Sequence, residues 1–209
     1  MNTDKEKELR VPLRGDRYAE GVERMNPCLI DVPEEFATER MVVRCARPGE
    51  GAAVNLAVRE SMEELKLWMP WAQMVPTLED SEAHGRRAYA RFLAREDLTY
   101  RGWLKDSQTF VVGSGLHRIN WGVPKFEIGY WVRTSFAGKG YVREIVCALA
   151  KLAFERLNAR RVEIRCDDLN KKSGRVAERC GFQLEGILRN DDRGMGGSLR
   201  STRVYSKIR

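Results

Sequence analysis

The stretch that decides the fold is Gly129–Val146, which reads GYWVRTSFAGKGYVREIV. Its first residues are aromatic and β-branched, as is typical of a strand, and a loop follows in which Gly138 and Gly140 flank Lys139. Apolar residues then recur at helical spacing from Val142 onward. The stretch therefore predicts a strand, a glycine loop and a helix in immediate succession.

A strand that enters a helix through glycines exposes backbone N–H groups at the positive end of the helix dipole. The loop is therefore a candidate anion-binding corner, although the two glycines alone are weak evidence and favour a plain tight turn. The phosphate-binding pattern Gly-x-x-x-x-Gly-Lys-Ser/Thr is excluded because Gly140 and Tyr141 follow Lys139. The dinucleotide pattern Gly-x-Gly-x-x-Gly is excluded because Arg143 replaces its third glycine.

The sequence upstream of this stretch predicts the first half of an α+β domain. A strand at 39–46 precedes helices that begin near 53 and at two capping motifs, Ser61-Met-Glu-Glu and Thr77-Leu-Glu-Asp. The period then changes from helical to alternating. Three strands joined by short turns predict an antiparallel meander, at 98–104, 109–119 and 125–131.

Downstream, alternating apolar residues predict a strand at 160–166. Asn170 caps the next predicted helix and Gly181 ends it. Two further strands, 183–190 and 200–208, complete the pattern, with a glycine-rich loop between them. The chain thus reads as one strand, two or three helices, three strands, a helix, a strand, a helix and two strands, so we expect one α+β domain with a mixed sheet.

The composition is that of a globular domain. The 209 residues are 43% hydrophobic, and the longest apolar run, 145–150, is far shorter than the roughly 20 residues that span a bilayer. Five cysteines form no Cys-x-x-Cys pair and only two histidines are present, so we expect neither disulfides nor a metal site. The N-terminus lacks the pattern of a secretory signal, so we expect a cytoplasmic protein without a membrane partner.

Residues 1–38 are charged, contain three prolines and show no sustained period, so we expect a loosely ordered N-terminal arm before a domain at 39–209. The net charge of +7 is uneven, since 189–209 holds six basic residues and two acidic ones. Such a surface can attract nucleic acid or a ligand phosphate, or it can be a solvated face. No motif of a sequence-specific nucleic-acid-binding protein is present.

The glycine loop, with the motifs GLHR, FEIGYW, GKGY, Asn-x-x-Ser, Gly-Phe and EG..RN, resembles the GNAT superfamily of acetyl-CoA-dependent N-acetyltransferases. From residue 39 to the C-terminus the chain is similar to the RimJ/RimL branch, which acetylates the N-termini of ribosomal proteins. The resemblance implies a three-layer domain in which helices flank a central mixed, mostly antiparallel sheet. It also implies that acetyl-CoA is the cosubstrate.

In that family the loop amides bind the pyrophosphate of acetyl-CoA, flanking cations add attraction, an asparagine bonds the pantetheine arm, and a strand amide holds the oxyanion. By position the resemblance assigns these roles to Trp131, Val132, Arg133, Gly138, Lys139, Gly140, Tyr141, Val142, Arg143 and Asn170.

The chain departs from the family pattern at two positions. Ser135 stands where Gln or Arg is preferred, which suggests that Arg133 binds the phosphate in its place. Ala177 stands where many members carry the tyrosine that protonates the leaving thiolate. Ser173 matches a serine of the RimL-like branch, so we expect it to protonate or hydrogen-bond the sulfur, with an ordinary helix-start serine as the alternative.

Acetyl transfer requires a neutral amine, so a base must take a proton from the ammonium. Glu127 alternates with the apolar residues of its strand and therefore faces the opposite side, where burial would raise its pKa. We expect it to be the base or to bind the amine, with an ion pair to Arg118 or Arg165 as the alternative. Asp192, which we expect in the loop between the last strands, is the second candidate base.

The resemblance alone implies that the acceptor is a peptide or protein N-terminus, such as that of a ribosomal protein, attacked directly in a ternary complex. A small polyamine, amino acid or aminoglycoside is the alternative, as is a non-catalytic acyl-CoA-binding module, and a homodimer is possible. The segment Trp68-Met-Pro-Trp71 could wall an acceptor site, but its composition favours the core. For His117 we favour a structural hydrogen bond over catalysis.

Overall fold

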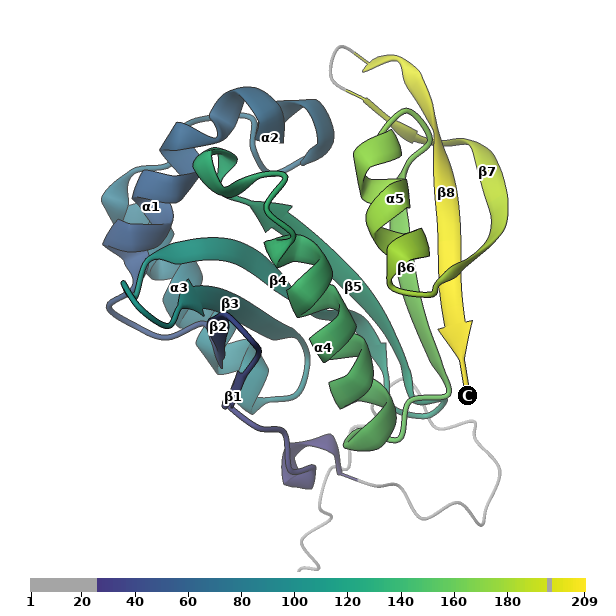
Figure 1. The fold of residues 1–209 in the computed structure, drawn as a ribbon, viewed down its shortest axis with the longest axis horizontal. Helices are drawn as coiled ribbons and strands as arrows, with labels where there is room; N and C mark the ends of the chain where they lie inside the picture. The colour runs from purple at the N-terminus through teal and green to yellow at the C-terminus, as the bar shows by residue number, and fades with distance from the viewer. Residues whose placement is uncertain (1–25, 195–196) are drawn as a thin grey trace, which may run out of the picture.

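The computed structural model describes residues 26–194 and 197–209, which form a sheet of eight strands with helices on both faces (Figure 1). The strand order is β1-β2-β3-β4-β5-β6-β8-β7. The strands are β1 (Glu35–Ala37), β2 (Met41–Cys45), β3 (Leu98–Leu104), β4 (Phe110–Asn120), β5 (Lys125–Val132), β6 (Arg161–Asp167), β7 (Gln183–Arg193) and β8 (Leu199–Ile208). The helices are α1 (Gly51–Glu60), α2 (Met62–Trp68), α3 (Leu78–Leu93), α4 (Tyr141–Glu155) and α5 (Lys171–Arg179).

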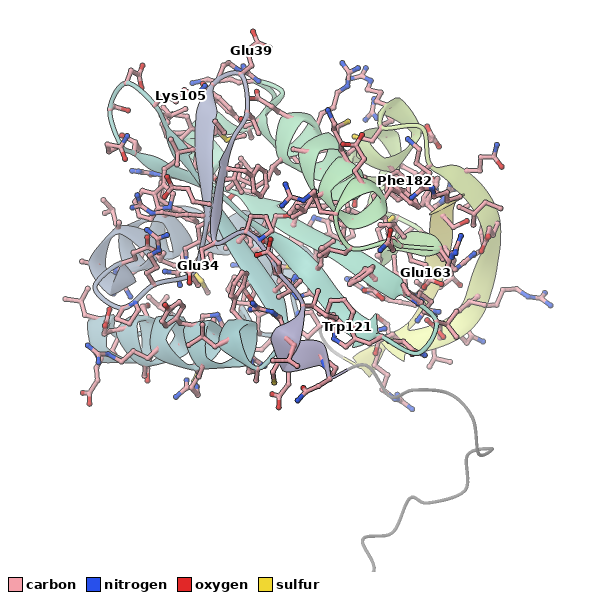
Figure 2. The ribbon with its side chains drawn as sticks, turned by 90° about the horizontal axis from the view of Figure 1, so that it is seen from below. Glu34, Glu39, Lys105, Trp121, Glu163 and Phe182 are labelled. Carbon is pink, nitrogen blue, oxygen red and sulfur yellow. The ribbon has the colours of Figure 1, made fainter. Side chains whose placement is uncertain are left out.

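The predicted α+β fold is confirmed. Helices α4 and α5 cover one face of the sheet, and α1 and α3 cover the other (Figures 1 and 2). Every neighbouring pair of strands is antiparallel except β5 and β6, so the sheet is mixed and mostly antiparallel. In the part of the chain that the structure describes, no helix is long and apolar enough to cross a membrane.

The parallel pair β5 and β6 separates after a short contact. Its register covers three residue pairs, from Lys125 with Arg161 to Glu127 with Glu163. Beyond this point β5 continues to Val132 paired only with β4, and β6 continues paired only with β8. The two strands therefore diverge toward the glycine loop and open the sheet at that end.

The core fixes both strands before they diverge. Helix α4 buries the predicted stripe that includes Ile145 and Leu149, and Phe126 and Ile128 of β5 are buried in the same cluster. A fully buried side chain of this size contributes about 1.5–3 kcal/mol to the free energy of unfolding. Side chains alternate along a strand, so the other β5 residues, such as Glu127, lie on the opposite face of the sheet.

A glycine of β4 places the indole of Trp131. Gly113 lies opposite Trp131 in the β4–β5 register, and a Cβ atom at residue 113 would come within 2.2 Å of the indole Nε1. The ring therefore lies directly over the glycine, where it also contacts Phe110 and Trp71 at centroid distances of 5.4 and 6.0 Å. Only glycine leaves room for this arrangement.

The sheet begins earlier than expected, because β1 lies within the expected arm. It pairs with β2, Val32 is 4% exposed, and the Tyr100 hydroxyl donates to the carbonyl of Pro33. At the other end of this hairpin, Lys105 donates to the carbonyls of Thr38 and Glu39 (Figure 2). Residues 26–38 thus pack against the domain, while the rest of the expected arm lies outside the described residues.

Candidate active site

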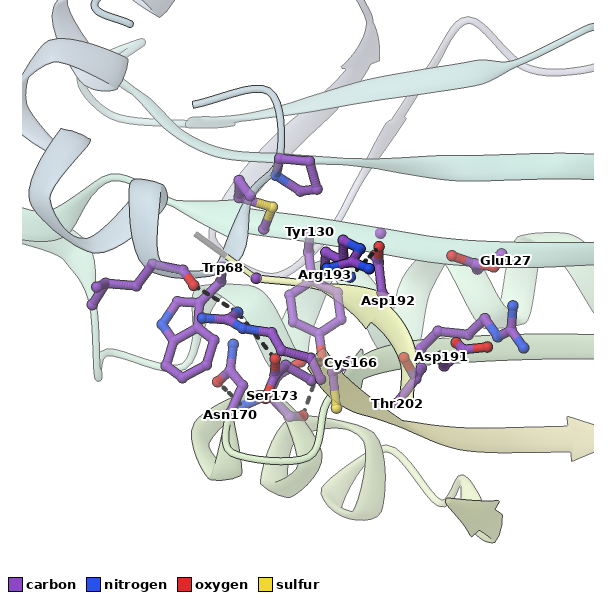
Figure 3. Close-up of a pocket in the computed structure, with 18 of the residues that line it drawn as sticks. Trp68, Glu127, Tyr130, Cys166, Asn170, Ser173, Asp191, Asp192, Arg193 and Thr202 are labelled. Atoms are coloured by element: carbon purple, nitrogen blue, oxygen red, sulfur yellow. Dashed lines mark hydrogen bonds and ion pairs between the residues drawn. The ribbon is translucent and has the colours of Figure 1, made fainter. Parts of the chain in front are cut away.

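Two cavities lie where β5 and β6 diverge. The loop cavity, of about 790 Å³, is lined by the glycine loop, the start of α4 and one face of α5. The sheet cavity, of about 560 Å³, is lined by β5, β6, β7 and the end of α2 (Figure 3). Five residues line both cavities, namely Trp68, Met69, Tyr130, Asn170 and Ser173. These five residues form the junction between the two cavities.

The glycine loop leaves an open cradle at the start of α4. Gly138 and Gly140 have φ angles of +76° and +85°, which residues with a side chain rarely adopt. A Cβ atom at residue 138 would meet nothing within 4 Å, so the space beside it is open. No side chain in the described ranges caps α4. Its first N–H groups therefore have no side-chain acceptor among the described residues, and residues 140–143, which carry them, line the loop cavity, as an anion site requires.

Four cations line the loop cavity, and only one of them was expected. Arg143 lies at the cavity as predicted. Sequence reasoning missed Lys172, Arg175 and Arg179, although their spacing of three and four residues on the predicted helix could have shown that they share one face. Together these cations favour a ligand with several negative charges.

The two other expected cations point elsewhere. The Arg133 guanidinium makes an ion pair with Glu60 of α1 at 2.6 Å, and Lys139 Nζ lies 5.0 Å from the centre of the Phe136 ring. Neither side chain lines the loop cavity. Because Glu60 already pairs with Arg133, the structure lends no support to the suggestion that Arg133 binds the phosphate in place of residue 135, which stays a prediction.

The end of α1 and the start of α2 hold the glycine loop in place. Glu60 also accepts the Ser135 N–H, Ser61 Oγ accepts the Thr134 N–H at 2.9 Å, and Glu64 accepts the Thr134 hydroxyl. Burial acts to raise the pKa of Glu60, but the hydrogen bonds from Ser135 and Arg133 outweigh it and lower that pKa. The predicted capping role of Ser61 is wrong, since its hydroxyl fixes the loop instead of capping α2.

At the junction, two hydroxyl groups meet. Tyr130 Oη lies 2.8 Å from Ser173 Oγ and donates to the Ser173 carbonyl at 3.0 Å (Figure 3). Asn170 Oδ1 accepts the Ser173 N–H at 3.1 Å, so the predicted cap is confirmed. Burial raises the pKa of Tyr130, which therefore stays protonated. Sequence reasoning missed Tyr130, because an aromatic residue in a strand is usually part of the core.

Ala177 is fully buried, which explains the missing tyrosine. Its side chain is 0% exposed and belongs to the main core cluster under α5. A tyrosine there would displace the core instead of reaching the junction. Tyr130 places a phenol beside Ser173 from the strand side instead.

Glu127 lies on the wall of the sheet cavity, three residues before Tyr130 on β5. It is 17% exposed, and its carboxylate lies 3.4 Å from Arg118, which was one of the expected partners. Burial raises the pKa of Glu127, while the charges of Arg118 and Arg165 act in the opposite direction. Because a strand rises about 3.3 Å per residue, Glu127 sits roughly 10 Å along β5 from the junction.

Asp192 lies in β7, and its expected place in a loop is wrong. It pairs with Arg200 across the β7–β8 ladder, its carboxylate accepts the Arg193 N–H, and it lines the sheet cavity. The strand extends further than predicted because β8 continues the pairing as far as Leu199.

Arg200 fixes the end of α2 over the junction. Its guanidinium donates to the Leu67 carbonyl at 2.9 Å, pairs with Asp167 at 3.0 Å, and lies 5.5 Å from the centre of the Trp68 ring. Trp68 and Met69 line both cavities, as the acceptor-site reading expected, and Met69 also packs against a buried hydrophobic cluster, as the core reading expected.

A hydrogen bond supports the prediction that His117 has a structural and not a catalytic role. Its Nδ1 lies 2.8 Å from the Asp97 carboxylate, and it is not among the residues that line either cavity. This contact joins β4 to the residue that directly precedes β3.

Comparisons with known proteins agree with this geometry. Residues 40–183 match the sequence profile of the acetyltransferase (GNAT) domain. YdaF of Bacillus subtilis (strain 168), provisionally named a ribosomal N-acetyltransferase, is 31% identical over 157 residues, which are 73% of this chain and 82% of that protein. The ribosomal-protein-serine acetyltransferase of Escherichia coli (strain K12) is 40% identical over 82 residues, 39% of this chain and 45% of that protein.

Solved structures share the fold. RimL, the ribosomal L7/L12 alpha-N-protein acetyltransferase, in complex with coenzyme A, has a TM-score of 0.78 at 23% identity, over 84% of this chain and 98% of that one. The microcin C7 self-immunity acetyltransferase MccE, in complex with acetyl-CoA and AMP, has a TM-score of 0.79 at 22% identity, over 85% and 98%. The protein is therefore an acyltransferase. It belongs to the GNAT acetyltransferase family.

Replacing the buried alanine tests why the family tyrosine is absent. Ala177→Tyr should lower the free energy of unfolding by about 3 kcal/mol or prevent folding, because the core has no room for the ring. Urea denaturation measures this, and the exposed Arg175→Tyr on the same helix should change stability by no more than about 0.5 kcal/mol. An Ala177→Tyr protein as stable as the wild type would contradict the explanation.

Proposed function

We propose that this chain transfers the acetyl group of acetyl-CoA to the N-terminal amine of a peptide or protein, with ribosomal proteins as the first candidates. The observation that carries the proposal is the junction, where five residues line both the loop cavity and the sheet cavity. The ribosomal names of YdaF and of the Escherichia coli relative support the choice of acceptor. Such acceptors are made in the cytoplasm, which we propose as its location.

The loop cavity fits acetyl-CoA, which supplies an acetyl group activated as a thioester. Its open glycine cradle and the free amides of α4 suit a pyrophosphate. The four cations on α4 and α5 suit its phosphates, since Lys and Arg bind phosphate oxygens through charge-assisted hydrogen bonds. The volume of about 790 Å³ leads from this cradle to the junction.

The junction residues have separate roles in this proposal. Asn170 uses its Oδ1 to cap α5, so its amide NH₂ remains free to donate to the pantetheine arm. The Ser173 hydroxyl donates to the leaving sulfur in the arrangement in which Tyr130 turns its one O–H proton from the Ser173 carbonyl to Ser173 Oγ, which lies 2.8 Å away. The Arg133 N–H donates to the Val111 carbonyl of β4, so by strand alternation the Trp131 N–H is also directed to β4. The backbone N–H groups of its neighbours Tyr130 and Val132, on the edge of β5 that faces the gap, are the proposed donors to the oxyanion.

The sheet cavity holds the acceptor amine and the base. Glu127 combines partial burial with a raised pKa, so it is a better proton acceptor near neutral pH than an ordinary glutamate. Its distance from the junction means that a proton reaches it through water or along the bound acceptor. Asp192 remains the second candidate for this role.

Calorimetric titration with coenzyme A analogues tests the cofactor site. Acetyl-CoA should bind, and an analogue that lacks the pyrophosphate should bind at least about 100-fold more weakly, because it cannot form several of the charge-assisted hydrogen bonds. Peptides that copy ribosomal-protein N-termini should then be acetylated on the α-amine, as mass spectrometry reports. Absence of acetyl-CoA binding at millimolar concentration would overturn the proposal.

Glu127→Gln tests the base. The variant should lose about 100-fold in kcat/KM at neutral pH, while its Kd for acetyl-CoA stays within about twofold of the wild type. The wild-type rate should fall as pH is lowered through the raised pKa of Glu127, so this limb lies above the usual glutamate value of about 4.3 and disappears in the variant. If Asp192→Asn removes the limb instead, Asp192 is the base.

Tyr130→Phe tests the hydroxyl pair. Removing the hydrogen bond to Ser173 should lower kcat about tenfold and leave KM nearly unchanged, because the acceptor and acetyl-CoA still bind. Since Tyr130 acts through Ser173, adding Tyr130→Phe to Ser173→Ala should cost little more than Ser173→Ala alone. Fully additive effects would count against this role, and Tyr89→Phe on the distant α3 serves as the control.

A further inference from the structure

One cation of the sheet cavity has no partner. Arg165 projects from β6 on the same sheet face as Glu127, and it lines the cavity. No carboxylate of residues 26–194 or 197–209 forms an ion pair with it, and its Nε is buried without any hydrogen-bond acceptor there. The other cations of the cavity are all engaged: Lys66 by Glu63, Arg118 by Glu127, Arg200 by Asp167, and Arg193 by the Gly197 carbonyl.

A buried donor without an acceptor is costly, and the cost is greater for a charged group. Glu127 does not remove this cost for Arg165. Its carboxylate is directed to Arg118, and Arg165 influences Glu127 only through its charge. A water molecule could satisfy one N–H of Arg165, but it would leave the positive charge without a counter-charge. An anion in the sheet cavity would supply both the hydrogen-bond acceptor and the counter-charge.

The shape of the Arg165 guanidinium indicates which class of anion fits best. A guanidinium presents parallel N–H groups that match the two oxygens of a carboxylate. Phosphate would fit the same fork, but the acidic residues Glu127, Asp191 and Asp192 line this cavity and disfavour a doubly charged ligand. A single carboxylate is therefore the anion that the charges around Arg165 suit best.

We propose that Arg165 binds a carboxylate of the acceptor, so that the preferred acceptor is an amine with a carboxylate close to the reacting nitrogen. This inference rests on the proposed function, because it assumes that the acceptor occupies the sheet cavity. The carboxylate can come from an Asp or Glu side chain near a peptide N-terminus, or from the α-carboxylate of a free amino acid. Asp192 remains available to the ammonium, as does Glu127 once the ammonium takes the place of Arg118.

Binding measured without turnover tests the subsite separately from the reaction. The protein is saturated with coenzyme A and titrated calorimetrically with two C-terminally amidated peptides, Ser-Glu-Ala-Ala and Ser-Gln-Ala-Ala. Serine and serinamide form the second pair, which reports on a free α-carboxylate. In at least one pair, the wild type should bind the carboxylate ligand about tenfold or more tightly than its amide, as a charge-assisted bidentate contact predicts.

Arg165→Gln should bring that preference close to one while leaving the affinity for the amide ligand within about twofold. Arg165→Lys keeps the positive charge but lacks the parallel N–H groups of the guanidinium, so it should retain part of the preference. This variant replaces Arg165→Gln in the experiment if Arg165→Gln does not fold. Arg189→Gln, an exposed arginine of β7 that lines neither cavity, should keep the full preference.

The outcomes separate this inference from the proposed function. Equal affinity for carboxylate and amide in both pairs, or a preference that survives Arg165→Gln, overturns the role of Arg165. Peptides that are acetylated without such a preference leave the proposed function intact. An Arg165-dependent preference for serine over serinamide, with no peptide acetylated, supports the subsite and overturns the peptide acceptor.

Discussion

The site depends on the short parallel contact between β5 and β6. Three residue pairs hold the strands together, and the absence of further pairing between these two described strands leaves the space in which the two cavities lie. The core packs α4 against β5 up to this point, and β8 supports β6 beyond it. Beyond the contact, β5 therefore stays paired with β4 and β6 with β8, while the edges of β5 and β6 that face each other are unpaired within the described part of the chain. A longer contact would close the junction, and a shorter one would leave the two halves of the sheet poorly joined.

The charges of the site are arranged by region. The loop cavity gathers cations from α4 and α5 around an open glycine cradle, whereas the sheet cavity mixes acidic and basic groups. Arg133 shows that position in the sequence does not decide which group a cation serves. Arg133 lies at the start of the glycine loop, but it forms an ion pair with Glu60 of α1. This ion pair helps to fix the loop in place. The cations that face the loop cavity come mainly from α5, about 40 residues later in the chain.

The sequence predicted the elements well because their signals are local. Alternation, helical periodicity, the cap at Thr77 and the glycine that ends α5 depend on near neighbours, and all agree with the structure. Residues whose role depends on distant partners were harder to predict. Ser61 is followed by a normal capping pattern, but its partner is Thr134, and Tyr130 resembles a core residue until Ser173 is placed beside it. The extension of β7 over Asp192 likewise depends on β8.

Helix α2 connects the two ligand sites mechanically. Its beginning is fixed to the glycine loop through Ser61 and Glu64, and the residues at its end, Trp68 and Met69, line the junction. A ligand that shifts this helix in either cavity therefore changes the shape of the other. By thermodynamic linkage, the factor by which the first ligand alters the affinity for the second is the factor by which the second alters the affinity for the first. Any such coupling would pass through one seven-residue helix.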